Sequence, residues 1–249
     1  MSGHSKWSSI KHRKAAVDAK RGKLFTKLIK EITVAARMGG GDPNGNPRLR
    51  SAIIAARVAS MPNDTIDRAV KRGTGDLEGV EYVDVTYEGY GPGGMAVMVE
   101  VLTDNRNRTV ADVRNVFSKN HGHMGESGSV AWMFDRIGQI RTKSAGVTEE
   151  RLLEIAADAG ATDIRAEEAG FVVTTGVDVL EPVRAALENA GIAPDAVELV
   201  LVPKSTVHLT GGDAAKALRL LEALEDHDDV QRVSANFDID DEELSRLSA

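Results

Sequence analysis

The apolar positions between residues 14 and 38 recur at spacings of three and four, and this stretch contains no proline. That period is typical of an amphipathic helix. A second helix is predicted to begin at Pro47, because proline fits the first turn of a helix. A third, short helix is predicted to run from a cap at Asn63 or Asp64 to a closing glycine, Gly73. Together these segments predict a compact helical bundle of about 75 residues.

After this bundle the pattern changes to an alternation of β-branched and polar residues, which is typical of strands. Three strands are predicted near 82–88, 95–102 and 129–134, with a helix at 109–119 before the third. The next elements are predicted as strand 137–142, helix 148–159, strands 162–166 and 170–175, helix 178–190 and strand 197–202. The last elements are predicted as a strand at 205–210, a helix over 213–225 and a strand near 230–236.

The elements between 137 and 202 follow the order βαββαβ, which is that of a ferredoxin-like sandwich. The elements from 95 to 134 and from 205 to 236 can be joined into a second such unit around it. We therefore expect an α+β multidomain chain with an N-terminal helical bundle followed by two ferredoxin-like α/β sandwich domains, the third inserted in the second. The predicted domains are residues 1–78, residues 79–135 plus 204–240, and residues 136–203.

The composition is that of a globular protein, because 249 residues with 42% hydrophobic content can bury a core. The chain contains no cysteine, which excludes disulfides and thiolate metal sites. No apolar run reaches the length of a membrane span, and charges occupy the positions where a signal peptide needs apolar residues. The sequence therefore predicts a cytoplasmic protein without membrane contact.

The distribution of charge is more informative than the net charge of −7. Residues 1–75 contain 16 Lys and Arg against 5 Asp and Glu, whereas the rest of the chain contains 15 against 33. Such asymmetry is typical of a polyanion-binding module joined to other domains. On the first helix, the basic residues fall within an arc of about 100° opposite the apolar face. These residues are Lys20, Lys23, Lys27, Lys30 and Arg37.

This basic surface is predicted to contact the phosphates of a nucleic acid, because Lys and Arg supply most non-specific affinity through counterion release. The alternative is an ordinary solvated helix face. Trp7 lies among these charges, where its ring either stacks on a base or anchors the N-terminal arm. The predicted nucleic-acid-binding residues are Lys6, Lys11, His12, Arg13, Lys14, Lys20, Arg21, Lys23, Lys27, Lys30, Arg37, Arg68, Lys71 and Arg72.

A second phosphate site is conceivable in the run TDNRNRT, at the end of a strand and just before a helix. In one interpretation Asn105, Arg106 and Arg108 hold a phosphate or carboxylate together with the first amides of the helix. In the other, Asn105 and its neighbours form the turn and cap while the arginines pair with surface acids. The second interpretation is slightly favoured.

Patterns that resemble catalytic motifs do not support an enzyme. The run GYGPGG at 89–94 is followed by a strand, so a hairpin turn is favoured over a phosphate loop. The run GESGS has Ser129 where the hydrolase elbow requires glycine. His121, His123 and Glu126 would need a further ligand to bind a metal, and an exposed loop is favoured. We expect no metal, cofactor, small-molecule substrate or catalytic residue. A ligand-sensing or hydrolytic protein and a protein-interaction scaffold are the rival classes.

Long segments between residues 3 and about 138 resemble the signature sequences of the YebC/PmpR family. They are GHSKWSSIKHRK, DAKRGKLFTKLIKEI, AARMGGGDPNGNPRLRSAI, MPNDTIDRAVKRGTG, YEGYGPGGMAVMVEVLTDNRNRT and GESGSVAWMF. The resemblance implies a cytoplasmic three-domain protein, helical at its N-terminus and α/β thereafter. Family members are described as transcriptional regulators that bind DNA, and relatives that include a mitochondrial translational activator are tied to the ribosome. His121 departs from the family pattern, which more often has paired glycines in that loop.

The sequence leaves the choice between DNA and ribosomal RNA open. A helix-turn-helix is not indicated, because the first helix connection is a run of nine residues rich in glycine, proline and asparagine. Stacking platforms for single-stranded RNA are not indicated either, since aromatic residues make up 4% of the chain. The sequence therefore predicts a non-enzymatic regulator whose basic N-terminal residues position phosphates rather than read bases.

Overall fold

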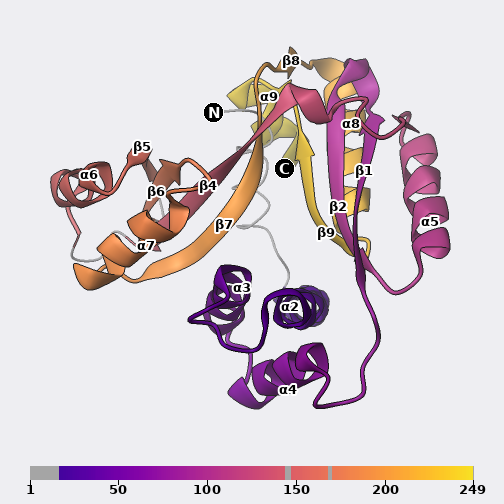
Figure 1. Cartoon of the computed structure of the whole chain (residues 1–249). Coiled ribbons are helices and arrows are strands. Elements are labelled where there is room, and N and C mark those ends of the chain that lie inside the picture. The colour runs from indigo at the N-terminus through magenta and orange to yellow at the C-terminus, as the bar shows by residue number, and fades with distance from the viewer. Residues whose placement is uncertain (1–16, 144–146, 168–169, 249) are drawn as a thin grey trace. The chain divides into compact units, whose positions relative to one another are not determined.

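The computed structural model describes residues 17–143, 147–167 and 170–248 (Figure 1). The chain divides into two compact units. Unit 1 comprises the described residues of Met1–Lys30, Val80–Asp135 and Val202–Ala249, and unit 2 comprises Glu31–Gly79 and Arg136–Leu201. The three domain boundaries expected from the sequence stay a prediction. Within the described residues, no helix is both long and apolar enough to cross a membrane.

Three helices form the N-terminal part of the described chain. They are α2 (Val17–Gly39), α3 (Pro47–Val58) and α4 (Asn63–Thr74). Pro47 is the first residue of α3, as predicted, and the Asn46 side chain caps the helix by accepting a hydrogen bond from the Leu49 amide at 3.1 Å. The same side chain donates to the Ala35 and Gly40 carbonyls, so it also fixes the end of α2. Asn46 therefore joins the end of one helix to the start of the next.

The ends of α4 differ from the prediction. Pro62 is its N-cap and no side chain caps it, so neither Asn63 nor Asp64 has the expected role. The helix continues through Gly73 and ends at Gly75, whose φ of 89° is the left-handed conformation that glycine adopts easily. Gly73 is buried within the helix, at a position where a Cβ atom would overlap the Thr33 carbonyl oxygen of α2. The glycine thus permits close helix packing rather than terminating the helix.

The remainder of unit 2 consists of a four-stranded sheet with two helices. Its elements are β4 (Phe134–Lys143), α6 (Glu149–Asp158), β5 (Ala161–Glu167), β6 (Gly170–Thr175), α7 (Leu180–Asn189) and β7 (Pro194–Pro203). The order of these elements is the βαββαβ order predicted for this segment, and the strands lie in the order β5-β6-β4-β7. Ile140, Leu152, Val173 and Leu187 are fully buried in its core, between the sheet and the helices.

Unit 1 contains a second four-stranded sheet, of order β3-β1-β2-β9. Its strands are β1 (Val83–Tyr90), β2 (Ala96–Thr103), β3 (His123–Met124) and β9 (Val230–Ala235). Helices α5 (Arg106–Lys119) and α8 (Gly211–Glu225) share one core with this sheet. Val99 of β2, Phe117 of α5 and Leu220 of α8 are fully buried there. The shorter elements are the 3-10 turns Pro92–Gly94 and Ala131–Met133, the strand pair β8 (Val207–His208) and β10 (Phe237–Asp238), and α9 (Asp241–Ser248).

The second βαββαβ unit expected from the sequence is wrong in its composition. The predicted strand at 129–134 is a 3-10 turn at Ala131–Met133, and the predicted strand at 205–210 is reduced to the two residues of β8. The sheet uses β1 instead. The physical reason is Glu88, whose carboxylate accepts hydrogen bonds from the amides of Gly128, Val130 and Ala131 at 2.6 to 2.9 Å. Amides that bond to this side chain are not available to a neighbouring strand.

Candidate nucleic-acid interface

Two lysines of α2 contact the C-terminal end of α8 in unit 1. The Lys23 ammonium donates to the Asp226 carbonyl at 3.0 Å, and the Lys27 ammonium donates to the Glu225 carbonyl at 2.7 Å. The last carbonyls of a helix lack partners within the helix and carry the negative end of its dipole. A lysine there is stabilised without any carboxylate. These two predicted site residues therefore contribute to the packing of α2 on the end of α8.

Lys30, one turn further along α2, is buried with 8% of its surface exposed. Its ammonium forms an ion pair of 2.6 Å with the Asp229 carboxylate and donates to the Asp228 carbonyl at 3.1 Å. The ammonium also lies 5.6 Å from the centre of the Tyr82 ring. The expectation that Lys30 belongs to a solvent-facing basic side of the helix is therefore corrected. Another part of the chain covers it and supplies its counter-charge.

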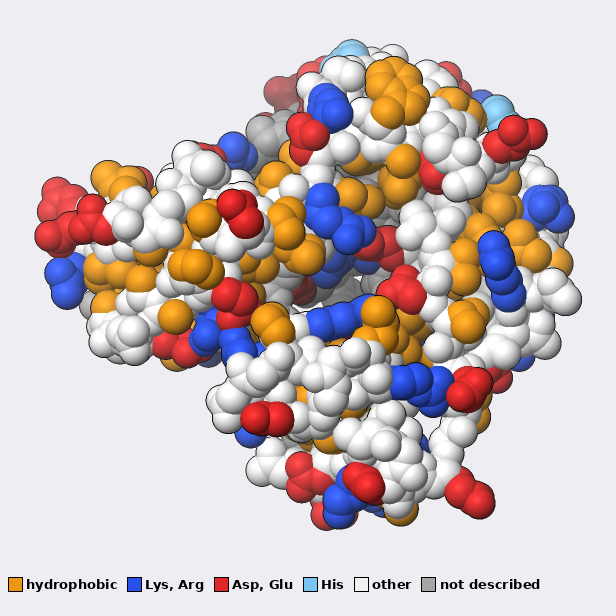
Figure 2. All heavy atoms as spheres, viewed as in Figure 1, with side chains coloured by type: hydrophobic (Ala, Val, Ile, Leu, Met, Phe, Trp, Pro, Cys, Tyr) orange, Lys and Arg blue, Asp and Glu red, His pale blue; other side chains and the backbone are white. Residues whose placement is uncertain are grey.

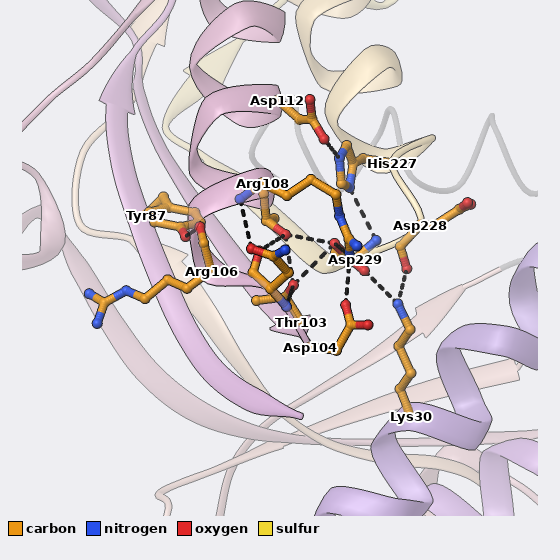
Figure 3. A network of polar contacts seen from close by, with 12 residues as sticks. Lys30, Tyr87, Thr103, Asp104, Arg106, Arg108, Asp112, His227, Asp228 and Asp229 are labelled. Carbon is orange, nitrogen blue, oxygen red and sulfur yellow. Dashed lines mark hydrogen bonds and ion pairs between the residues drawn. The ribbon is translucent and has the colours of Figure 1, made fainter. Parts of the chain in front are cut away.

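Asp229 is the centre of a polar network in unit 1 (Figure 3). Its second carboxylate oxygen accepts hydrogen bonds from Thr109 at 2.7 Å, and from Thr103 and Arg108 at 3.3 Å each. Burial of this carboxyl raises its pKa, but the hydrogen bonds from Lys30, Thr109 and Arg108 and the charge of Lys30 outweigh burial. They lower the pKa of Asp229 to about 2. The aspartate is therefore ionised at neutral pH.

A cavity of about 510 Å³ opens beside this network. Its wall includes Lys23, Lys30, Arg108 and His227, but it also includes five carboxylates. These belong to Asp104, Asp112, Asp226, Asp228 and Asp229. An acid-rich wall repels a phosphate. We conclude that the cations here stabilise the fold of unit 1 rather than form an anion site.

The residues of the conceivable second phosphate site have separate roles in the structure. The Asn105 side chain caps α5 by accepting a hydrogen bond from the Arg108 amide at 3.1 Å. Arg108 forms an ion pair with Asp104 at 2.6 Å in addition to its contact with Asp229. Arg106 is exposed, and its carbonyl accepts from Tyr87 at 3.5 Å. This geometry corresponds to the capping and pairing interpretation.

The cations of α4 are all exposed. Arg68, Lys71 and Arg72 lie in the last two turns of the helix. Arg68 forms a long ion pair of 3.5 Å with the Asp64 carboxylate and donates to the Asp64 carbonyl at 3.2 Å. Both partners of that pair are well exposed, so the pair adds little to stability. In Figure 2, Lys and Arg side chains alternate with Asp and Glu on the helices at the bottom of the view. On this face the cations do not form an uninterrupted patch.

The connection between α3 and α4 is short, unlike the connection between α2 and α3 on which the sequence argument against a helix-turn-helix rested. Only residues 59–62 join the two helices, and Ser60 adopts a left-handed φ of 59° there. Four residues is the length of the turn in helix-turn-helix units. The sequence predicted both helices, but only the connection between the first and the second was considered for this motif. The first turns of α4 carry Asp64 and Asp67, however, and in helix-turn-helix proteins that part of the second helix reads base edges.

The other predicted residues are distributed as follows. The side chains of Arg21 and Arg37 are exposed on α2, and the Arg21 guanidinium lies 5.3 Å from the centre of the Phe25 ring. Some residues considered in the sequence analysis lie outside the described part of the chain, namely Lys6, Trp7, Lys11, His12, Arg13 and Lys14. The side chain of Lys20 is also outside it.

The segments that resemble catalytic motifs all lie in unit 1. Residues 89–94 connect β1 to β2 in an antiparallel pair, which confirms the hairpin interpretation. His121 and His123 are exposed, as expected of their loop. In the part of the chain that the structure describes, no three His, Asp or Glu side chains are grouped to hold a metal ion.

Comparison with known proteins gives consistent matches along the chain. A family model described as the TACO1/YebC protein N-terminal domain matches residues 5–76, and one described as the TACO1/YebC second and third domain matches residues 82–237. A protein of Desulfotalea psychrophila named probable transcriptional regulatory protein is 57% identical over 249 residues, which is 100% of both chains. A Geobacter sulfurreducens protein with the same description is 56% identical over 247 residues, covering 99% of this chain and 100% of its own.

A solved structure is also similar. The crystal structure of a conserved hypothetical protein from Aquifex aeolicus superposes with a TM-score of 0.83 at 48% sequence identity. The match covers 92% of this chain and 94% of that chain. The similarity thus extends over the helical and the α/β parts.

Proposed function

The chain belongs to the TACO1/YebC family, and from this premise we propose that it is a non-enzymatic, nucleic-acid-binding regulator of gene expression. Its relatives are named probable transcriptional regulatory proteins, which supports a regulator role. The specific form that we propose is a cytoplasmic DNA-binding transcriptional regulator whose basic N-terminal residues contact phosphates. The alternative is a translation factor that binds ribosomal RNA.

The observation that carries the proposal is the exposure of Arg68, Lys71 and Arg72 on α4. These side chains belong to the segment in which basic residues outnumber acidic ones 16 to 5. Exposed cations in an otherwise acidic chain favour contact with a polyanion, because each phosphate contact releases condensed counterions. The cations of α4 lie at its C-terminal end, whereas Asp64 and Asp67 lie near its start. This arrangement supports phosphate positioning over base reading.

The test is a measurement of binding across a series of salt concentrations, with duplex DNA and with a folded RNA fragment. We expect the logarithm of the affinity to fall linearly with the logarithm of the salt concentration. The double variant Lys71→Glu/Arg72→Glu should bind more weakly, and its slope should be reduced by about 2, since each phosphate contact contributes a slope of about 0.9. Affinity that does not change with salt would contradict the proposal.

A matched control is available on α5. The double variant Arg114→Glu/Lys119→Glu makes the same charge change at exposed helical positions outside the proposed interface. If it weakens binding as much as Lys71→Glu/Arg72→Glu, the effect reflects net charge and the interface is misplaced. Charge reversal of Lys30 is not a suitable test, because it would place a second carboxylate beside buried Asp229.

Crosslinking in cells followed by sequencing of the bound nucleic acid distinguishes the two targets. Recovery of promoter fragments supports the transcriptional form of the proposal. Recovery of ribosomal RNA supports the translational alternative, in which the same phosphate contacts act on folded RNA.

A further inference from the structure

A second cavity, of about 520 Å³, lies in unit 1 beside the turn between β1 and β2. None of the predicted interface residues that the structure describes lines it. Its wall consists of the 91–94 turn and the side chains of Tyr90, His121, His123, Asp213 and Lys216. The volume is in the range of small-ligand sites, which is about 300 to 1,000 Å³. The wall combines aromatic rings, a cation and a carboxylate.

The aromatic part of the wall is a stacked pair. The rings of Tyr90 and His123 have centroids 5.3 Å apart and planes inclined by 29°. The Tyr90 hydroxyl donates to the Ser129 carbonyl at 3.1 Å, which fixes the orientation of the tyrosine ring. His123 is exposed and lines the cavity, so part of its ring is accessible there. An oriented aromatic face at a cavity is suited to stack on a nucleobase.

A further exposed aromatic ring is fixed by the same carbonyl. The Trp132 indole nitrogen donates to Ser129 at 3.1 Å, although 67% of the residue surface is exposed. The loop that carries Ser129 is in turn held by the three amide contacts to Glu88. Trp132 and Tyr90 therefore donate to the same carbonyl, which belongs to a loop with a defined position. Two such platforms suit consecutive bases of a strand better than a single free nucleotide.

The backbone at the edge of the cavity also carries strain. His121 has a φ of 60°, a left-handed conformation that non-glycine residues rarely adopt. Glycine at this position would have no such strain. Residues in strained backbone conformations cluster at functional sites. The side chain of His121 lines the cavity, so its strained conformation indicates a functional role for that side chain.

The two charged side chains of the wall, Asp213 and Lys216, belong to the first two turns of α8. The Lys216 ammonium lies 3.4 Å from the Asp213 carboxylate, and both residues are partly exposed. The ammonium and the two histidines are suited to a phosphate. The carboxylate is not, but it is a good acceptor for a ribose hydroxyl.

We propose that this cavity binds one nucleotide of a single RNA strand. The base stacks on His123, the phosphate contacts Lys216 and His121, the 2′-hydroxyl donates to Asp213, and the neighbouring base stacks on Trp132. This inference rests on the form of the proposed function in which the partner is RNA, because it identifies a second contact for that partner. It adds the chemistry that the basic helices lack, namely recognition of an unpaired base and of ribose.

The experiment measures fluorescence anisotropy of the full chain with a labelled ten-nucleotide single-stranded RNA. Competitors are the DNA of the same sequence and adenosine monophosphate. The variant His123→Ala/Lys216→Met should bind the RNA at least about ten-fold more weakly, because loss of one stacked base alone has about that effect. The matched control is His208→Ala/Arg219→Met, which also removes one histidine and one cation, at exposed positions outside the cavity. Its affinity should stay within about two-fold of the wild type.

Each outcome is decisive for one claim. Equal affinity of the cavity variant and its control overturns the site. Competition by adenosine monophosphate as strong as that by the unlabelled RNA shows a site for free nucleotides and overturns the strand assignment. Equal competition by DNA overturns the ribose assignment. This inference alone is refuted if the wild type binds duplex DNA through Lys71 and Arg72 and the cavity variant binds the labelled RNA as tightly as the wild type does. The proposed function is refuted if the wild type binds no nucleic acid.

Discussion

Replacement of Asp229 by asparagine tests whether the network in Figure 3 stabilises unit 1. The substitution keeps the size of the side chain and removes its charge. Lys30 is then left buried with a neutral partner, and Arg108 and the two threonine hydroxyls lose a charged acceptor. Removal of one partner of a buried ion pair is costly because the remaining charge is uncompensated.

The magnitude follows from the pKa of the carboxyl group. The pKa of Asp229 is about 2 instead of 3.8. Each pKa unit corresponds to about 1.4 kcal/mol, so the ionised aspartate contributes about 2 kcal/mol to the free energy of unfolding. The unpaired Lys30 adds to the loss, and we expect a total of about 2 to 4 kcal/mol for Asp229→Asn at pH 7.

The effect depends on pH with a defined sign. The folded-state pKa of Asp229 is depressed, so its stabilisation is complete above the unfolded pKa of 3.8 and is lost as the pH falls towards 2. The difference in stability between the wild type and Asp229→Asn should therefore be constant from pH 5 to pH 7. It should shrink between about pH 4 and pH 2.

The assay is thermal unfolding followed by the fluorescence of Trp132, which lies in unit 1, in a background with Trp7→Phe. For a chain of this size, a loss of about 2 to 4 kcal/mol lowers Tm by roughly 4 to 16 °C. Asp228→Asn is the matched control, because Asp228 is exposed and accepts from Lys30 only through its carbonyl. If Asp229→Asn lowers Tm no more than this control, the network does not stabilise unit 1 and the reasoning is refuted.

Two other substitutions test the local packing. Glu88→Gln should speed amide hydrogen exchange of Gly128, Val130 and Ala131 by about ten-fold or more, since a charged carboxylate accepts stronger hydrogen bonds than the neutral oxygen of a glutamine side chain. Unchanged exchange rates would show that the carboxylate does not hold the loop. Gly73→Ala should lower the free energy of unfolding by about 1 to 3 kcal/mol in a denaturant titration, because its Cβ would overlap α2. Gly22→Ala, also helical but with open space around it, should instead gain up to about 1 kcal/mol, because alanine has the higher helix propensity. A gain at both positions would show that the close packing does not require glycine at position 73.

The local sequence pattern was sufficient to predict those elements whose conformation is determined by a few neighbouring residues. Helix α3 begins at Pro47, and the hairpin at 89–94 joins two strands, because proline and glycine fix the backbone where they stand. The exposed cations at the end of α4 follow from the same helical period that buries Ile66 and Ala69. These features depend on covalent geometry and short-range spacing.

Features that depend on distant segments were not predictable. Lys30 has the position of a surface lysine on an amphipathic helix, but its partner Asp229 is 199 residues away in the sequence. Glu88 has the spacing of a solvent-facing residue in a strand, yet it is buried and accepts three backbone amides. Periodicity identifies the polar side of an element, but not which polar residue a later segment covers.

The pairing of β2 with β9 has a consequence for synthesis of the chain. Strand β2 hydrogen-bonds to β9, and all elements from α5 to α8 are translated between them. A nascent chain therefore has one edge of β2 open until residue 235 has left the ribosome. Open edges of apolar strands attract other chains, and distant pairing slows folding. Premature termination before β9 should thus give aggregation-prone fragments, so this fold depends on synthesis that runs to completion.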